Sequence, residues 1–355
     1  MTNYKLPDFK DFTHNIDGKN THLFVLRNRG GMQVAFTDYG ARIVSILVPD
    51  KAGNLRDVVL GFNSIKEYLH AEEQYHGATI GRFANRIAKG QFTLGEDNYT
   101  LQQNNGQNSL HGGPAGFHSK VWDRRTSFKK KIDFCYISPD GEEGFPGNLK
   151  VYVSYELTED NEIIIKYNAK TDKKTIVNLT NHAYFNLDGE GHGNILSHIL
   201  HLPSDHFLPI DENQIPLERE ASVEGTAFDF RSPKKVATDI DNDEEQLTLG
   251  NGYDHTFVNS QPISQVAASA YSPNSGIRLE VFTTEPGIQL YTGNFLSGKD
   301  TGKSGHKYFP RSAFCFETQH YPDSPNHPHF PSVVLEPGQI LESETKYKFS
   351  LRKEM

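Results

Sequence analysis

Segments in which apolar and polar residues alternate recur through most of the chain, and they limit the folds that it can adopt. In Leu149–Leu157 every second residue is apolar or aromatic, and Glu162–Ala169 continues after the turn Glu159-Asp160-Asn161. Period-two alternation is typical of a β-strand with one buried face. Amphipathic helix patterns are scarce, and we expect one short helix at Ser64–His70. The sequence therefore predicts an all-β protein, a large antiparallel β-sandwich.

The remaining strand-like segments are separated by clusters of Gly, Pro, Asn and Asp, which favour turns. They are Leu23–Arg27, Gln33–Thr37, Ala41–Val48, Ile277–Thr283, Ile288–Gly293, Ala313–Glu317 and Tyr347–Leu351, with a hairpin formed by Phe92–Leu94 and Tyr99–Leu101. No repeat, low-complexity tract or linker interrupts the series. We therefore expect residues 1–355 to form a single domain, although length alone would suggest about two.

Charge and cysteine usage exclude some classes of partner. The formal net charge of −9 argues against nucleic acid, whose phosphates require a basic surface. The first residues contain no apolar run, so we expect no signal peptide and no membrane anchor. Cys135 and Cys315 are far apart and have neither CxxC nor zinc-site spacing, which favours free thiols in a reducing compartment. Together these features predict a cytoplasmic protein.

The stretch Thr175–Leu187 carries the strongest indication of a site. Read as one strand, it has a mainly apolar face and a polar face that carries Asn178, Thr180, His182, Tyr184 and Asn186. Amide, hydroxyl, imidazole and phenol groups suit a wet cleft better than a face exposed to bulk solvent. His182, at the centre, is then either a residue of a cleft or a structural histidine bonded to a neighbouring strand.

A second candidate is Glu317, in the segment Ser312–Gln319. Phe314 and Phe316 point one way while Cys315 and Glu317 point the other, so we expect this strand to be covered on both faces and to end at Glu317. A carboxylate at the edge of a buried strand loses solvation, which raises its pKa toward the range of a general base. The alternative is a structural salt bridge or a side chain that reaches solvent.

Two loops are rich in groups that can bond hydroxyls: GRFANR at 81–86 and NNGQNSLHGG at 104–113. Asn85, Arg86 and His111 stand out, because the guanidinium offers a rigid fork of donors for paired oxygens. His111 has the alternative of being an ordinary turn residue.

Asp254 and Gln289 are further candidates for a polar cleft. Asp254 lies between aromatic residues in a segment that we expect to be a loop, where Asp is common for local reasons. Gln289 shares a strand face with Tyr291, and its alternative is a plain cross-strand amide.

Two other patterns suggest ligands but lack the required spacing. GKDTGKS at 298–304 has three residues between its glycines where a phosphate loop has four, and it leads toward a strand. His320, His327 and His329 with Asp323 lie in a Pro-rich segment whose spacing matches no common metal site. We expect neither segment to bind phosphate or metal.

In combination, the motifs resemble the aldose 1-epimerase family. The matching segments, in family order, are GRFANRIAKGQF at 81–92, NNGQNSLHGG at 104–113, GEEGFPGNLKV at 141–151, NLTNHAYFNLDG at 178–189, GYDHTFV at 252–258, TEPGIQLYTGNFL at 284–296 and FETQHYPDSPNHPHFPSVVLEPG at 316–338. The resemblance implies a galactose mutarotase-like sandwich that binds an aldose in a cleft and needs no cofactor or metal.

The resemblance also implies roles for individual residues. His182 matches the general acid and Glu317 the general base; the sugar-binding residues are Asn85, Arg86, His111, Asp254 and Gln289, with Tyr184 on the same wall. Ala183 stands where many members have serine, but in a strand it would face away from the cleft.

Such an enzyme interconverts the α and β anomers of free hexoses such as D-galactose and D-glucose. One proton must leave the C1 hydroxyl while another reaches the ring oxygen O5, so we expect Glu317 near O1 and His182 near O5. His182 must then be partly protonated, and Glu317 partly ionised, at the same pH.

Two other functions fit parts of the sequence. A sugar-phosphate epimerase of the same fold would need additional Arg or Lys residues beside the motifs, and no such cluster occurs there. A sugar-binding module without catalytic activity could keep Arg86 and Asp254, but it would not need both His182 and Glu317. We expect an aldose substrate, no nucleic acid or membrane partner, and a monomer or homodimer.

Overall fold

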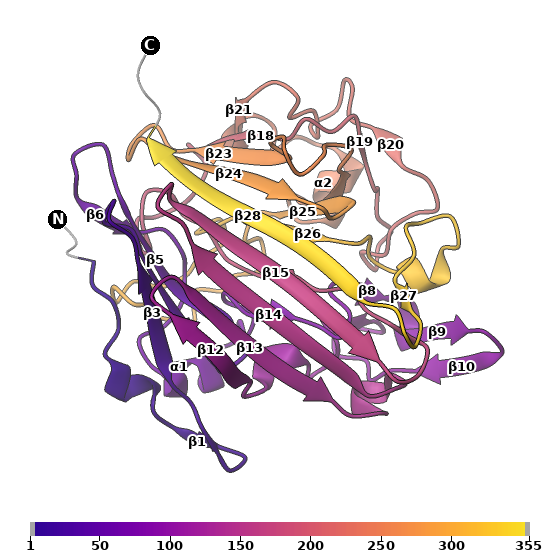
Figure 1. The fold of residues 1–355 in the computed structure, drawn as a ribbon. Coiled ribbons are helices and arrows are strands. Elements are labelled where there is room, and N and C mark those ends of the chain that lie inside the picture. The colour runs from indigo at the N-terminus through magenta and orange to yellow at the C-terminus, as the bar shows by residue number, and fades with distance from the viewer. Residues whose placement is uncertain (1–3, 352–355) are drawn as a thin grey trace.

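The computed structural model describes residues 4–351, and β-strands predominate in them (Figure 1). The largest layer is a nine-stranded antiparallel sheet. In spatial order its strands are β12 (Asp123–Phe128), β13 (Lys131–Ser138), β14 (Leu149–Leu157), β15 (Glu162–Thr171), β28 (Leu341–Leu351), β24 (Ile277–Thr283), β23 (Ala268–Tyr271), β18 (Ile199–His201) and β21 (Lys234–Lys235).

Two smaller sheets and several strand pairs complete the strand arrangement. The five-stranded sheet has the order β20 (Ala221–Ser222), β19 (His206–Phe207), β22 (Asp254–Val258), β25 (Gly287–Tyr291) and β26 (Cys315–Gln319). The four-stranded sheet contains β3 (Leu23–Arg27), β4 (Gln33–Thr37), β5 (Arg42–Pro49) and β6 (Leu55–Asp57). The pairs are β1 (Asn15–Ile16) with β2 (Lys19–Asn20), β7 (Thr79–Ile80) with β17 (Thr180–Asn181), β8 (Arg86–Ile87) with β11 (Ser109–Leu110), β9 (Gln91–Leu94) with β10 (Asp97–Thr100), and β16 (Thr175–Ile176) with β27 (Val334–Leu335). The predicted antiparallel β-fold is confirmed.

The nine-stranded sheet buries one face and exposes much of the other, as its alternation predicts. On β14, Val151, Val153 and Tyr155 are fully buried, whereas Lys150 and Glu156 are exposed. The buried face contributes to a continuous apolar core. Because such burial contributes about 25 cal/mol per Å² of apolar surface, this face supplies much of the driving force for folding.

The five-stranded sheet packs against that buried face. The Tyr347 hydroxyl on β28 donates to the Phe316 carbonyl on β26 at 3.3 Å, and the hydroxyls of Thr345 and Thr318 are 2.6 Å apart. β26 is therefore covered by the nine-stranded sheet on the face of Phe316 and Thr318. Its other face, which carries Glu317, is available for a site.

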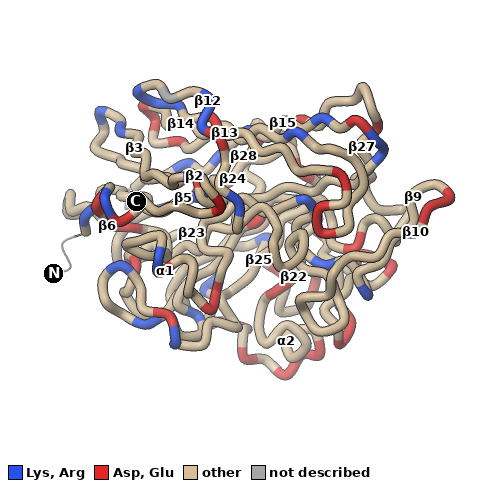
Figure 2. Tube along the Cα trace, turned by 90° about the horizontal axis from the view of Figure 1, so that it is seen from below, with Lys and Arg blue, Asp and Glu red and all other residues tan. Residues whose placement is uncertain are grey.

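The helices follow their local signals. Ser64 precedes α1 (Ile65–His70), and its hydroxyl accepts a hydrogen bond from the amide of Glu67, as an N-cap does. The acidic run at 239–245 leads into α2 (Glu245–Leu249), where Figure 2 shows acidic residues gathered on the surface. None of the helices in residues 4–351 combines the length and apolar character needed to cross a membrane.

Three sequence predictions about strands are wrong. Thr175–Leu187 is not one strand, because its backbone amides bond to different neighbours: Val177 to Val333, His182 to Ala78 and Phe185 to Phe314. β26 continues past Glu317 to Gln319, so this glutamate lies in mid-strand. Asp254 begins β22 rather than lying in a loop.

Candidate active site

A pocket of about 320 Å³ lies between the five-stranded sheet and the loops around β7, β8 and β11. Every predicted site residue except Gln289 lines it. The lining consists of Glu73, Tyr75, Asn85, Arg86, Asn104, Asn105, Leu110, His111, His182, Tyr184, Gln214, Asp254, Tyr291, Phe295 and Glu317.

Three adjacent strands build the floor of the pocket by their register. Asp254 on β22 is opposite Tyr291 on β25, which is opposite Cys315 on β26. In the next row of the same face, Gln289 is opposite Glu317. Since paired residues share a face and period two repeats it, all five side chains point to the same side of the sheet.

Glu317 is almost completely buried, at 2% relative exposure, although it lines the pocket. Its Oε1 lies 3.5 Å from Nε2 of His182, and its Oε2 has no hydrogen-bond partner in the described part of the chain. Burial, followed by the nearby carboxylates of Asp254 and Glu73, raises the pKa of Glu317 well above its ordinary value. Oε2 is thus a buried oxygen without a partner, and Oε1 is the oxygen that faces His182.

His182 is held on several sides. Its ring stacks on Tyr184 at 4.8 Å and lies nearly parallel to Tyr75 at 5.8 Å. Its Nδ1 is 3.6 Å from the sulfur of Cys315, while Nε2 faces Glu317. Burial lowers the pKa of His182 to about 3.

Burial disfavours the charged forms of both residues, so the surroundings of the pair do not favour the expected combination of an ionised Glu317 and a protonated His182. A neutral carboxylic acid beside a neutral imidazole nevertheless contains the same number of protons as the ionised pair. Transfer of one proton across the 3.5 Å gap converts one form into the other without uptake from solvent. For acid–base chemistry, the total number of protons on the two residues therefore matters more than the pKa of either one.

The side wall is built by the short pair β8 and β11, in which Arg86 is opposite Leu110. Asn85 donates its backbone amide to Nδ1 of His111 at 3.1 Å, and its side-chain oxygen accepts from the amide of Arg86 at 2.8 Å. Asn85 and His111 both have positive φ, 67° and 52°, a region in which Asn and His are enriched. These bonds fix the two loops relative to each other.

Close backbone contact reinforces that arrangement. Gly112, directly after His111, has φ of +81°, and a Cβ at this position would lie 2.1 Å from the carbonyl oxygen of Gly81. Only glycine fits such an approach. The glycines of the two motifs thus bring the strand that carries Arg86 against the turn that carries His111.

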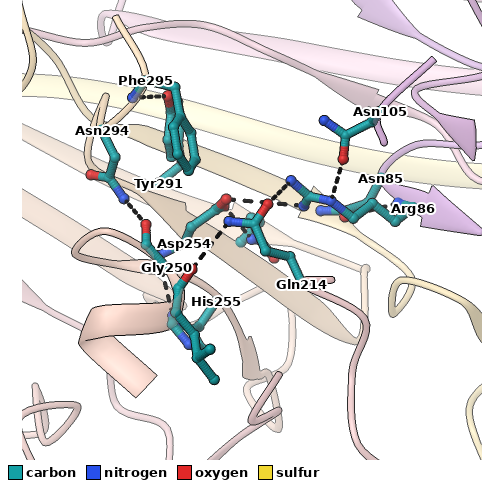
Figure 3. Close-up of polar contacts among 12 residues, drawn as sticks. Asn85, Arg86, Asn105, Gln214, Gly250, Asp254, His255, Tyr291, Asn294 and Phe295 are labelled. Atoms are coloured by element: carbon teal, nitrogen blue, oxygen red, sulfur yellow. Dashed lines mark hydrogen bonds and ion pairs between the residues drawn. The ribbon is translucent and has the colours of Figure 1, made fainter. Parts of the chain in front are cut away.

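Arg86 lies at the centre of a polar network (Figure 3). Its guanidinium donates to Asn105 at 3.0 Å and to Gln214, and it lies 4.0 Å from the carboxylate of Asp254. Burial raises the pKa of Asp254, and the charge of Arg86 opposes that shift. The network leaves Arg86 and Asp254 fixed at the wall of the pocket.

Gln289 is the one predicted binding residue that does not line the pocket. Its Nε2 donates to Asp254 at 2.7 Å and its Oε1 accepts from the hydroxyl of Thr256 at 2.5 Å. The Gln289 amide orients Asp254 and does not line the pocket. These contacts fit a cross-strand amide better than a residue in direct contact with a ligand.

The two arginines of GRFANR have different functions. Arg82 points away from the pocket and donates to the carbonyls of Pro146 and Gly147 at 2.7 and 2.9 Å, and to the hydroxyl of Ser138 at 2.5 Å. It fastens the segment at 138–147 to the motif. Arg86 alone reaches the pocket.

His111, His182 and Glu317 also place three potential metal-ligating atoms within 4.8 Å of one another. Nδ1 of His111 accepts a hydrogen bond from Asn85, so the neutral ring must carry its proton on Nε2, the other nitrogen. A protonated nitrogen cannot ligate a metal. The hydrogen bonding of His111 therefore opposes metal binding at this cluster.

The segments rejected from their spacing have structural partners. Lys303 of GKDTGKS is bonded to Asp57 at 2.7 Å, and in the described chain no helix begins directly after residue 304. His327 pairs with Asp323 at 3.1 Å, whereas His320 pairs with Glu285 at 2.7 Å. Cys135 and Cys315 are both buried and free, as expected.

Several lining residues were not predicted. Glu73 and Tyr75 belong to the turn before GRFANR, Gln214 lies in a loop far from any recognised motif, and Phe295 forms an exposed rim beside Tyr291. Tyr291 could have been found, because it shares the face of Gln289 and Glu317. For Glu73 and Gln214 no local pattern indicates the pocket, since only tertiary folding brings them there.

Comparison with known proteins gives a consistent result. A model of the family "Aldose 1-epimerase" matches residues 22–348. The galactose mutarotase of Bos taurus is 46% identical over 321 residues, covering 90% of this chain and 92% of the relative; the aldose 1-epimerase of Escherichia coli strain K12 is 41% identical over 337 residues, covering 94% and 96%.

Solved structures agree as well. An aldose epimerase homologue from C. elegans has a TM-score of 0.87 at 32% identity and covers 94% of this chain and 100% of its own. A galactose 1-epimerase from Lactobacillus acidophilus has a TM-score of 0.84 at 32% identity and covers 96% and 97%.

Proposed function

The chain belongs to the aldose 1-epimerase family, and from this we propose that it is an isomerase that interconverts the α and β anomers of free hexoses such as D-galactose and D-glucose. The proposal is carried by one observation: His182 and Glu317, which are far apart in the sequence, face each other at 3.5 Å in one pocket. A binding site alone would not need an acid and a base in contact.

We propose that Glu317 removes the proton of the C1 hydroxyl while Nε2 of His182 delivers one to O5. The electrons of the O1–H bond then form the aldehyde C=O, and the C1–O5 bond breaks. After rotation about C1–C2, both transfers run in reverse and the ring closes on the other face. Each group is typically worth about 10²–10⁴-fold in rate.

The proton balance of the pair suits this reaction. Together the two residues offer one proton to donate and one site that can accept a proton. Ring opening of the sugar uses both. A C1 hydroxyl that donates to the carboxylate of Glu317 favours its ionised form, and the charge of Arg86 lowers the pKa of Glu317 in the same sense. Binding of the sugar would thereby move the shared proton to His182. Since both protons return after each cycle, the chemistry needs no metal, nucleotide or redox group.

The remaining lining groups would hold the other hydroxyls. Asn85, Arg86, His111 and Asp254 present donors and acceptors from fixed backbone positions, with Tyr184 beside His182. We propose that Gln289 acts through Asp254, which it orients. Restricting the sugar to motion at C1 lowers the entropic part of the barrier.

A sugar phosphate is a poor fit to this pocket. Among the described residues that line it, Arg86 is the only Arg or Lys, and its guanidinium is engaged by Asn105, Gln214 and Asp254. Glu73, Asp254 and Glu317 supply carboxylates, which repel a phosphate dianion when ionised. The charge distribution supports a free sugar as substrate.

Polarimetry of freshly dissolved D-galactose tests the catalytic proposal. Glu317→Gln should reduce mutarotation by at least about 100-fold because the amide cannot accept the proton as a base. Calorimetric binding of D-galactose should persist. The control is Glu344→Gln on β28, a strand glutamate paired with Lys166 at the surface, which should keep full activity.

The outcomes separate the competing functions. Near wild-type turnover in Glu317→Gln would reject the role of this residue. A wild-type protein that binds D-galactose without accelerating mutarotation would be a sugar-binding module, and activity confined to sugar phosphates would indicate the other epimerase. We further propose that the chain is a single domain, active in the cytoplasm as a monomer or homodimer.

A further inference from the structure

The acid His182 has an unusual partner at the nitrogen that faces away from the substrate. Catalytic and metal-binding histidines commonly place a carboxylate, a carbonyl or water at that position. Here Nδ1 lies 3.6 Å from the sulfur of Cys315, which is completely buried. Cys315 is on β26, two residues before Glu317 and on the same face, so one strand supplies both neighbours of the imidazole.

The catalytic cycle places a requirement on this nitrogen. A protonated His182 carries protons on both ring nitrogens, and it gives the one on Nε2 to O5. The neutral ring that remains must keep its proton on Nδ1, because Nε2 has to be empty to take the proton back. Nδ1 therefore needs a hydrogen-bond acceptor in both states, inside a site that burial has made dry.

We propose that Cys315 is a positioning residue for His182: its sulfur accepts the hydrogen bond of Nδ1–H and so reserves Nε2 for proton exchange with the sugar. The inference rests on the proposed acid role of His182. The nearly parallel rings of Tyr184 and Tyr75 restrict rotation of the imidazole, so its two nitrogens keep their separate neighbours.

A neutral sulfur suits this role better than a carboxylate. A carboxylate at Nδ1 would stabilise the imidazolium and hold the proton that must be released. Burial and the carboxylates of Glu317, Glu73 and Asp254 raise the pKa of Cys315, which keeps it as an uncharged thiol. A weak, uncharged acceptor orients the ring while leaving Nε2 free to give and to take a proton.

The competing explanation is that Cys315 only fills space in its apolar cluster. In that case its removal would lower stability and leave both the tautomer of His182 and the turnover number unchanged. The chain offers a matched control, since Cys135 is the other cysteine, is equally buried, and lies on β13 in the nine-stranded sheet instead of on the strand of Glu317.

Steady-state mutarotation of D-galactose by Cys315→Ala, Cys315→Ser and Cys135→Ala tests the inference in the full-length protein. We expect Cys315→Ala to lower kcat by about tenfold to a hundredfold, the usual effect of removing a group that orients a histidine, with KM changed by less than about twofold. Cys315→Ser should recover most of the loss, because the hydroxyl also accepts a hydrogen bond. Cys135→Ala should retain the wild-type kcat.

The tautomer is measured directly by ¹⁵N NMR of histidine-labelled wild-type protein, with the signals of His182 assigned from the spectrum of His182→Gln. Protonation on Nδ1 is expected. Protonation on Nε2, or an unchanged kcat in Cys315→Ala, would overturn the inference. If Cys315→Ala does not fold, the inference is tested by the tautomer in the wild-type spectrum and by the kcat of Cys315→Ser. A wild-type protein without mutarotase activity would instead reject the proposed function, whatever the tautomer.

Discussion

The two layers of the sandwich use their strands differently. In the nine-stranded sheet, alternate residues face a core and the surface, so Val151, Val153 and Tyr155 are buried beside exposed Lys150 and Glu156. In β22, β25 and β26 both faces are buried, and one of them carries carboxylates, amides and a thiol. The first arrangement supports the fold, and the second holds largely buried polar groups beside the pocket.

The difference implies that the two layers respond to substitution in opposite ways. Changes in the buried face of the nine-stranded sheet should alter stability with little effect on turnover. Changes on the polar face of β22, β25 and β26 should alter turnover with little cost in stability, because polar groups such as Asp254 and Glu317 are costly to bury.

The largest effect on stability is expected for Ile165→Ala on β15. Ile165 is fully buried in the main core, so the truncation should lower the free energy of unfolding by about 2–5 kcal/mol through lost burial and a cavity. Urea denaturation measures this value. The kcat/KM of the folded fraction should remain that of the wild type, and a parallel loss of kcat/KM would contradict the separation of the layers.

For Asp254→Asn, on the pocket face of β22, we expect a loss of activity and not of stability, and a smaller effect than that of Ile165→Ala. The asparagine can still accept the hydrogen bond of Gln289, but it loses the charge that faces Arg86 and the sugar. We expect kcat/KM for D-galactose to fall about 10–100-fold, as for loss of a charged hydrogen bond worth about 1.5–3 kcal/mol. The free energy of unfolding at pH 7 should stay level or rise, and a large decrease would show that the pocket face also supports the fold.

The smallest effect concerns Glu73 and pH. Burial raises the pKa of Glu73 from 4.5 to about 7, so its ionisation removes stability as pH rises between these values. Glu73→Gln should therefore gain stability relative to the wild type from pH 4 to pH 8, by about 1–2 kcal/mol once its partial exposure is taken into account. Thermal denaturation at both pH values measures the change, and Glu96→Gln, in an exposed hairpin turn, is the control. An equal difference in stability between Glu73→Gln and the wild type at pH 4 and at pH 8 would contradict the raised pKa of Glu73.

Much of the fold could be predicted because the nine-stranded sheet follows period two. β14 and β15 were located within two residues of their ends, and the capped helix α1 and the β9–β10 hairpin follow standard local signals. The same period-two criterion gave a wrong prediction for residues 175–187. All of its residues are buried, and its backbone bonds to several different segments. Its alternation therefore does not mark a buried and an exposed face of one strand.

The site was predictable in part for the same physical reason. Glu317 and Asp254 lie on strands whose register aligns them, and the resemblance to the family identified both. Gln289 was predicted to bind a hydroxyl directly, and sequence cannot show that its amide bonds Asp254 and Thr256. Glu73 and Gln214 reach the pocket only through tertiary folding, and the shared proton of His182 and Glu317 depends on a distance between separate chain segments.

The contact of Gly112 with the oxygen of Gly81 has a consequence for how these two loops can be altered. The two loops meet through bare backbone, with no room for even a methyl group between them. Neither loop can therefore be exchanged for a differently shaped one without moving the other. A graft of either loop should therefore replace both segments together.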